Sequence, residues 1–126
     1  MDGTVKESTA LIAASKVKGT SVYNPAGESL GSIDDIMVDK RSGHVAYAIM
    51  SFGGFLGIGN DYHPLPWSVL KYDTAKGGYV VSLNRAQLEK APAYKAGTNP
   101  AWGDENYETG IHRYYGVNPY WGDTWM

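Results

Sequence analysis

The chain has 126 residues, of which 43% are hydrophobic and 19% are charged, with a formal net charge of −2 and no cysteine. This composition is that of one ordinary globular domain and excludes a disordered chain. The charge leaves no excess of lysine and arginine to neutralise a nucleic-acid backbone or an anionic lipid surface, and the missing cysteines exclude disulfides and thiolate chemistry.

The N-terminal segment contains an apolar stretch, residues 10–14, that is too short for the hydrophobic region of a signal peptide. No run of about 18 apolar residues occurs, so we expect no direct insertion into a membrane. A cytoplasmic protein is the expectation, and the lack of cysteine is compatible with a reducing compartment.

Residues 21–31, SVYNPAGESLG, predict a short strand and a turn, because Pro25 and Gly27 together favour a chain reversal. A second tight turn at residues 41–43 leads into residues 44–52, HVAYAIMSF. There β-branched and aromatic residues alternate with small or flexible ones. This segment is predicted to be a central strand that is apolar on both faces.

In the segment between these two turns, the alternation of apolar and polar residues changes phase. Ile33 lies on one phase of the period-two pattern, whereas Ile36 and Val38 lie on the other. One extra residue must therefore intervene near Asp34 and Asp35, which predicts a β-bulge.

Two further strands are predicted after the glycine-rich stretch, in PLPWSVLKYD (residues 64–73) and GGYVVSL (residues 77–83), around a turn at residues 74–77. Five or six short strands at close spacing, in a chain with 16 glycines, favour a mainly β fold, a small antiparallel β-barrel.

Two helices are expected after the strands. Asn84 followed by Gln87 matches a capping box, and Pro92 lies just beyond, so residues 84–91 predict one short helix that closes the barrel. Further on, Asp104 is a candidate N-cap and Gly116 a candidate C-cap. The residues between them with helical spacing are Tyr107, Ile111, Tyr114 and Tyr115.

The sequence from Val22 to Asp73 resembles the PRC-barrel domain, and the resemblance covers roughly residues 10–94. Its more specific pieces are VYNPAGESLGSID, GHVAY, and GGFLGIG running into HPLPW, while YYGVNPYW in the tail resembles the end of stand-alone bacterial members. The resemblance implies residues 1–94 as a barrel domain with a short N-terminal lead-in. Residues 95–126 would be an aromatic extension that packs on the barrel or on a second subunit.

In that family the barrel serves as a docking module, as in the cytoplasmic part of the photosynthetic reaction-centre H subunit and the second domain of a ribosome-maturation factor. Neither use is catalysis. This chain lacks the transmembrane helix of the first and the RNA-binding domain of the second, so only the general docking role is carried over.

The stretch SFGGFLGIGNDYHPLPW, residues 51–67, suggests either a phosphate-binding loop or a structural corner. A phosphate loop needs a helix after its glycines, and Pro64 and Pro66 disfavour one. We interpret the stretch as a corner with an apolar rim, which marks an interface if it is exposed.

Two sets of polar residues are candidate sites. Asp34, Asp35, Asp39 and Glu28 could bind a cation or act as an acid/base pair, but they lack EF-hand spacing and suit a solvated bulge. The three histidines, at positions 44, 63 and 112, follow no zinc motif. His63 is expected to hydrogen-bond within the corner and His112 to favour the negative end of the tail helix.

The leading hypothesis is a non-enzymatic protein-interaction module that self-associates as a homodimer and docks on another protein. We expect no cofactor and no metal, because no motif supplies a cofactor cradle or metal-ligand spacing. We expect no nucleic-acid partner, because the tail is acidic. The alternative is a small-ligand or metal binder with a cleft between barrel and tail, lined by Tyr47, Tyr62, His63 and Trp67. The predicted interaction residues are Phe52, Phe55, Leu56, Ile58, Tyr62, Trp67, Tyr114, Tyr115, Tyr120 and Trp121.

Overall fold

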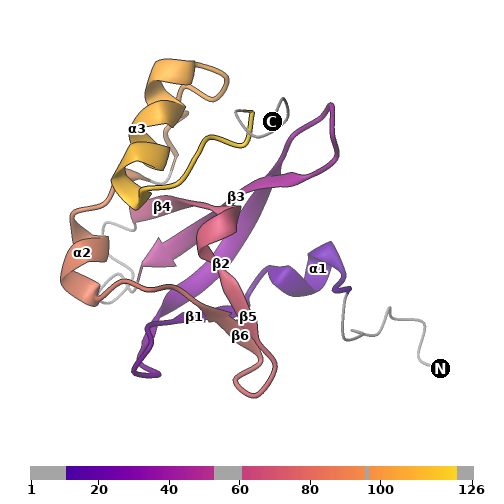
Figure 1. The fold of residues 1–126 in the computed structure, drawn as a ribbon, viewed down its shortest axis with the longest axis vertical. Helices are drawn as coiled ribbons and strands as arrows, with labels where there is room; N and C mark the ends of the chain where they lie inside the picture. Colours follow the sequence, from indigo (N-terminus) through magenta and orange to yellow (C-terminus); the bar gives the residue numbers. More distant parts are fainter. Residues whose placement is uncertain (1–10, 53–60, 96, 122–126) are drawn as a thin grey trace.

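A computed structural model describes residues 11–52, 61–95 and 97–121 (Figure 1). Most of the strands lie between the short helix α1 and the helices α2 and α3 along the chain. The elements are, in chain order, α1 (Ala14–Val17), β1 (Ser21–Tyr23), β2 (Ser29–Val38), β3 (Val45–Phe52), β4 (Asp61–Pro66), the 3-10 helix η2 (Trp67–Val69), β5 (Lys71–Asp73), β6 (Gly78–Val80), α2 (Arg85–Glu89), β7 (Tyr94–Lys95) and α3 (Glu105–Tyr115).

The strands form one seven-stranded sheet in the order β5-β6-β1-β2-β3-β4-β7. The mainly β class is confirmed, and the structure departs from the predicted small antiparallel barrel in two respects. β1 and β6 run parallel, with Val22 opposite Tyr79. Among the described residues no pairing joins β5 to β7, so hydrogen bonds do not close the sheet.

The β1–β6 contact is close. A Cβ atom added at Gly78 would lie 2.5 Å from the Ser21 carbonyl oxygen. The residue at this position must therefore lack a side chain for the two strands to pair at this separation.

The predicted β-bulge lies in β2. Ile33 pairs with Met50, and the next paired residue, Asp35, faces Ile49, so Asp34 is the extra residue. The bulge lets Ile33 point into the core while the exposed Asp34 and Asp35 face solvent.

β3 is the central strand that the sequence predicted. It pairs with β2 on one side and with β4 on the other, and residues 46–50 are all buried. Successive side chains of a strand point to opposite faces, so β3 supplies both sides of the sheet. Ala48 and Met50 face inward, whereas Tyr47 and Ile49 face outward.

The segment 64–73 is not one strand, contrary to expectation. Pro64 and Pro66 belong to β4, the chain then turns through η2, and β5 follows. β7 pairs only with Asp61 and Tyr62 among the described residues, so the prolines occupy the part of β4 that is an edge. A proline, which has no N–H to donate, is tolerated there. The turn that follows β4 therefore lies at Trp67–Val69.

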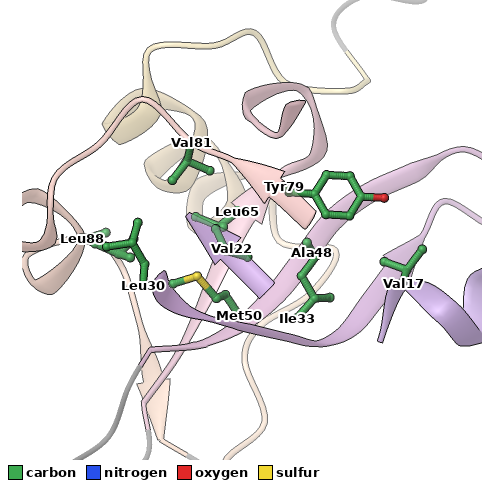
Figure 2. Packing of buried hydrophobic residues seen from close by; sticks show 11 residues of the cluster. Val17, Val22, Leu30, Ile33, Ala48, Met50, Leu65, Tyr79, Val81 and Leu88 are labelled. Atoms are coloured by element: carbon green, nitrogen blue, oxygen red, sulfur yellow. The ribbon is translucent and has the colours of Figure 1, made fainter. Parts of the chain in front are cut away.

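The inner face of the sheet encloses an aliphatic core (Figure 2). Val22, Leu30, Ile33, Met50 and Leu65 are each 0–1% exposed and come from four different strands. Leu88 of α2 closes this cluster. We call it the inner core.

Both helix predictions from capping signals are confirmed. In α2 the Gln87 N–H donates to Asn84 Oδ1 and the Asn84 N–H donates to Gln87 Oε1, which completes the capping box. In α3 the Asp104 carboxylate accepts from the Asn106 N–H, and Gly116 ends the helix at φ +69°. α2 is shorter than predicted at both ends.

Candidate interaction surface

α3 covers the outward face of β3 and β4 (Figure 1). Tyr47 and Ile49 of β3 meet Ile111 of α3, and all three are at most 3% exposed. We call this second cluster the outer core. The partly buried side chains around it are Met37, Tyr62, Tyr94, Trp102, Tyr107, Tyr115 and Tyr120.

A buried hydrogen-bond network lies within the outer core. The Tyr47 hydroxyl donates to Glu108 Oε1 at 2.7 Å and lies 2.8 Å from His112 Nε2. Glu108 Oε2 accepts from the Gly103 N–H at 2.7 Å. Because the one hydroxyl proton of Tyr47 goes to Glu108, the His112 ring must donate from Nε2 to the Tyr47 oxygen.

The network holds α3 on the sheet through a single tyrosine. Glu108 and His112 are spaced by one helical turn, so both reach the same point on β3. Burial, followed by the hydrogen bond to Glu108, raises the pKa of Tyr47 far above its ordinary value, so its hydroxyl remains a donor. Rings of Trp102, His112 and Tyr120 surround it, with centroids 5.3–5.7 Å away.

Two cavities flank Tyr120, and we call them together the Tyr120 groove. The first has a volume of about 610 Å³ and is lined by His44, Val45, Ala46, Pro66, Trp67, Ser68, His112, Asn118 and Tyr120. The second has a volume of about 620 Å³ and is lined by Asp39, Arg41, Ser42, Gly103, Glu105, Glu108, Tyr120 and Trp121. The groove thus runs between the sheet with its β2–β3 connection and the C-terminal extension.

The second cavity has a negative electrostatic environment. Burial raises the pKa of Tyr120 to about 12, and the next causes are the carboxylates of Glu108, Asp39 and Glu105 together with a hydrogen bond that the tyrosine donates to Glu108. Among the described residues, no lysine or arginine nitrogen lies within 4.0 Å of these three carboxylates.

The predicted interaction residues divide into three groups. Trp67, Tyr120 and Trp121 border the groove. Tyr62 stacks with Tyr94 at 5.6 Å in the outer core. Tyr114, 41% exposed, donates its hydroxyl proton to the Gln87 carbonyl, and Tyr115 packs between both cores.

The remaining predicted residues lie where the structure gives no side-chain description. Phe55, Leu56 and Ile58 fall within residues 53–60, outside the described ranges. Phe52 ends β3, and its side chain is likewise not described. The interpretation of the glycine stretch as an exposed rim stays a prediction.

The alternative prediction of a cleft is wrong, because its four residues, Tyr47, Tyr62, His63 and Trp67, do not line one cavity. In β4, Tyr62 points to the outer face, whereas His63 pairs with Met50 and is 1% exposed. Burial lowers the pKa of His63, and the Asp61 carboxylate and a hydrogen bond with the Pro92 backbone oppose this shift. Of this set only Trp67 lines the groove.

Each of the four candidate carboxylates has a partner within the protein, and that of Asp34 is the Tyr62 hydroxyl. Asp35 accepts from the Ile36 N–H, and Asp39 accepts from the Arg41 N–H and the Ser42 hydroxyl within its turn. Glu28 accepts from Asn24 and pairs with Arg85 at 3.8 Å. Within the described ranges no group of three potential metal ligands converges.

Sequence reasoning missed the Tyr47 network. A signal for it exists, because Glu108, Ile111, His112 and Tyr115 share one face of the helix, and a polar pair amid apolar residues on a buried face needs partners. What the sequence does not indicate is that the partner is Tyr47, far away in the chain.

A family model for the PRC-barrel domain matches residues 10–88. Among solved structures, that of RimM from Pseudomonas aeruginosa, a protein assigned to 16S ribosomal RNA processing, is similar over 60% of this chain, with a TM-score of 0.40 and 19% identity. The similarity spans 45% of that protein. No curated protein matches the chain significantly. In the described part of the chain, no helix has the length and apolar character needed to cross a membrane.

Proposed function

The chain belongs to the PRC-barrel family, and from this premise we propose that it is a non-enzymatic module that binds another protein along the Tyr120 groove. The groove itself carries the proposal. It joins two cavities of more than 600 Å³ each on either side of one tyrosine, with half-buried aromatic rings of Trp67, Tyr120 and Trp121 as walls. Aromatic side chains are favoured anchors in protein interfaces because they offer a large contact area at a small entropic cost.

A binding role is also supported by the burial and the hydrogen bonds of the polar residues beside the groove. Glu108 and His112 are 3% and 2% exposed and already hydrogen-bonded to Tyr47, which is 1% exposed. A general acid or base must reach a proton of its substrate. These side chains are instead committed to holding α3 on the sheet.

Site-specific photo-crosslinking tests the proposal. Ser68 is exposed and lines the first cavity, whereas Thr74 is exposed in the β5–β6 turn outside both cavities. With a benzophenone amino acid at Ser68, we expect a discrete crosslinked protein from the native host, identified by mass spectrometry. The same probe at Thr74 should give none, and equal products from both positions would overturn the groove as the binding surface.

A second copy of the chain is the first partner to test. The large apolar side chains that are most exposed, Leu11, Val38, Tyr72 and Tyr114, lie on separate elements, and α3 packs on its own sheet. We therefore propose the Tyr120 groove as the surface through which two copies would pair. Two-fold pairing is the commonest closed arrangement. Sedimentation at micromolar concentration should show a dimer, and a monomer would reject this partner.

A small organic ligand is the second candidate, favoured by the size of the first cavity. Its volume of about 610 Å³ falls in the range of ordinary ligand pockets. A thermal-shift screen with metabolites should then give a stabilising hit that Trp67→Ala abolishes. A flat response across the screen would remove this candidate.

A further inference from the structure

The second cavity of the Tyr120 groove has an excess of negative charge, which Arg41, attracted to Asp39, and Lys40 of the adjoining cavity offset only in part. Glu108 accepts hydrogen bonds from Tyr47, Gly103 and Tyr120, but these donors are neutral. Hydrogen bonds satisfy a buried carboxylate without neutralising it. The cavity adds Asp39 and Glu105 and a single cationic side chain, Arg41.

The N-terminus of α3 offsets part of this charge. Glu105 and Glu108 lie in its first turn, where the helix dipole contributes about half a positive charge. Even with this contribution and Arg41, the three carboxylates leave the cavity negative. The raised pKa of Tyr120 agrees, because the same three carboxylates disfavour its ionisation.

The walls of the cavity are aromatic. Tyr120 and Trp121 stand edge to face, with ring centroids 4.9 Å apart, and both line the cavity. Ring faces attract a cation, and a planar guanidinium can stack on a ring while it binds a carboxylate. The carboxylates do not converge as metal ligands within the described residues, which favours a large delocalised cation over a metal ion.

Resting on the proposed function, we infer that the second cavity receives an arginine side chain of the partner protein. Glu105 supplies an accessible carboxylate, since it is exposed and takes part in no hydrogen bond or ion pair among the described residues. Tyr120 and Trp121 supply the stacking surface. Buried Glu108 contributes through its charge.

Titration of the full chain with defined probes tests this inference. The probes are acetyl-Gly-Arg-Gly-amide, the same peptide with neutral citrulline in place of arginine, and magnesium chloride. The readout is the indole N–H resonance of Trp121, assigned with Trp121→Phe. We expect the arginine peptide to shift this resonance, the citrulline peptide to bind more weakly, and added salt to weaken the arginine peptide.

Glu105→Gln should weaken binding of the arginine peptide by about two- to fivefold, the range of an exposed ion pair. The matched control is Glu89→Gln, an exposed carboxylate on α2 outside both cavities, which should change nothing. Equal binding of citrulline, equal effects of the two variants, or a shift produced by magnesium at lower concentration than by the peptide would each overturn the inference.

This result is separable from that of the photo-crosslinking. A partner crosslinked at Ser68 whose capture is unaffected by Glu105→Gln and by free arginine peptide would leave the proposed function standing and reject the arginine. An arginine-selective shift without any crosslinked partner would reject the proposed function and leave a charge-selective cavity.

Discussion

The two apolar clusters of this chain lie on opposite faces of the same strand and are held in different ways. The inner core consists mainly of aliphatic side chains such as Leu65 and Met50, which need only be buried. The outer core combines Ile49 and Ile111 with the network centred on Tyr47, whose geometry is fixed by donors and acceptors. Burial is non-directional, so the inner core tolerates substitution by volume, whereas the outer core depends on particular atoms.

This difference fits the position of each cluster. The inner core lies almost wholly within the residues that match the family model, 10–88. The outer core joins that domain to a helix beyond it, so each half of the network comes from a different part of the chain. Hydrogen bonds are directional and specify one position of the added helix on the sheet, whereas apolar burial alone would allow several positions.

The largest expected effect concerns the inner core. Leu65→Ala should lower the free energy of unfolding by about 2–5 kcal/mol, because Leu65 is 0% exposed and its removal leaves a cavity. Leu65→Met, which conserves volume, should cost less than about 1.5 kcal/mol. Chemical denaturation measures both, and equal losses would mean that the inner core also depends on specific shape.

Tyr47→Phe tests the outer core. It should cost about 1–3 kcal/mol, because Glu108 and His112 lose a buried partner. Amide exchange in α3 should accelerate more than in β3, since the substitution loosens the attachment of the helix. The control is Tyr23→Phe, at a hydroxyl with no described partner, which should change stability by less than about 0.5 kcal/mol. Similar losses from both variants would contradict the structural role of the network.

Two glycines of the tail helix should respond with opposite signs. Gly116 ends α3 at φ +69°, so Gly116→Ala should destabilise by about 1 kcal/mol. Gly110 is exposed in the helix interior with nothing within 4 Å of an added Cβ, so Gly110→Ala should stabilise by about 0.5–1 kcal/mol. Thermal unfolding monitored in the far ultraviolet measures both. Two changes of the same sign would indicate that the helix end is not formed in this way.

Alkaline titration gives the smallest effect. The folded protein keeps the proton of Tyr120 up to a pKa of about 12, whereas the unfolded chain releases it near the ordinary value of 10.0. The unfolded state therefore binds fewer protons above that value, and this contribution to stability, present below pH 10, is lost as the pH rises towards 12. Denaturation at several alkaline pH values should show a shallower fall for Tyr120→Phe. An unchanged slope would mean that neither burial nor the carboxylates raise the pKa of Tyr120 in the folded protein.

The features that could be predicted from sequence are those set by neighbouring residues. The bulge at Asp34 follows from a phase change within six residues, and the caps at Asn84, Asp104 and Gly116 follow from short-range hydrogen bonds and backbone freedom. Each signal is complete within one turn or strand. For this reason tertiary packing did not override them.

The features that could not be predicted are set between distant residues. The parallel pairing of β1 with β6 and the network of Tyr47 with Glu108 and His112 join segments whose proximity no local pattern encodes. The prediction of one strand over residues 64–73 was wrong in its bounds, because Pro64 and Pro66 end β4 and the chain turns after them. Prolines are tolerated there because β7 is too short to pair with that part of β4, which no local pattern encodes.

The parallel contact between β1 and β6 also constrains how the chain folds. The antiparallel pairs β1–β2, β2–β3 and β3–β4 join consecutive strands, whereas β1 meets its other neighbour only after the chain as far as Gly78–Val80 has been synthesised. Closing such a long loop costs entropy before any contact repays it, and non-local contacts slow folding. On the ribosome, the nascent chain would hold a meander of four strands with two unpaired edges, β1 and β4, until β6 emerges and docks against β1.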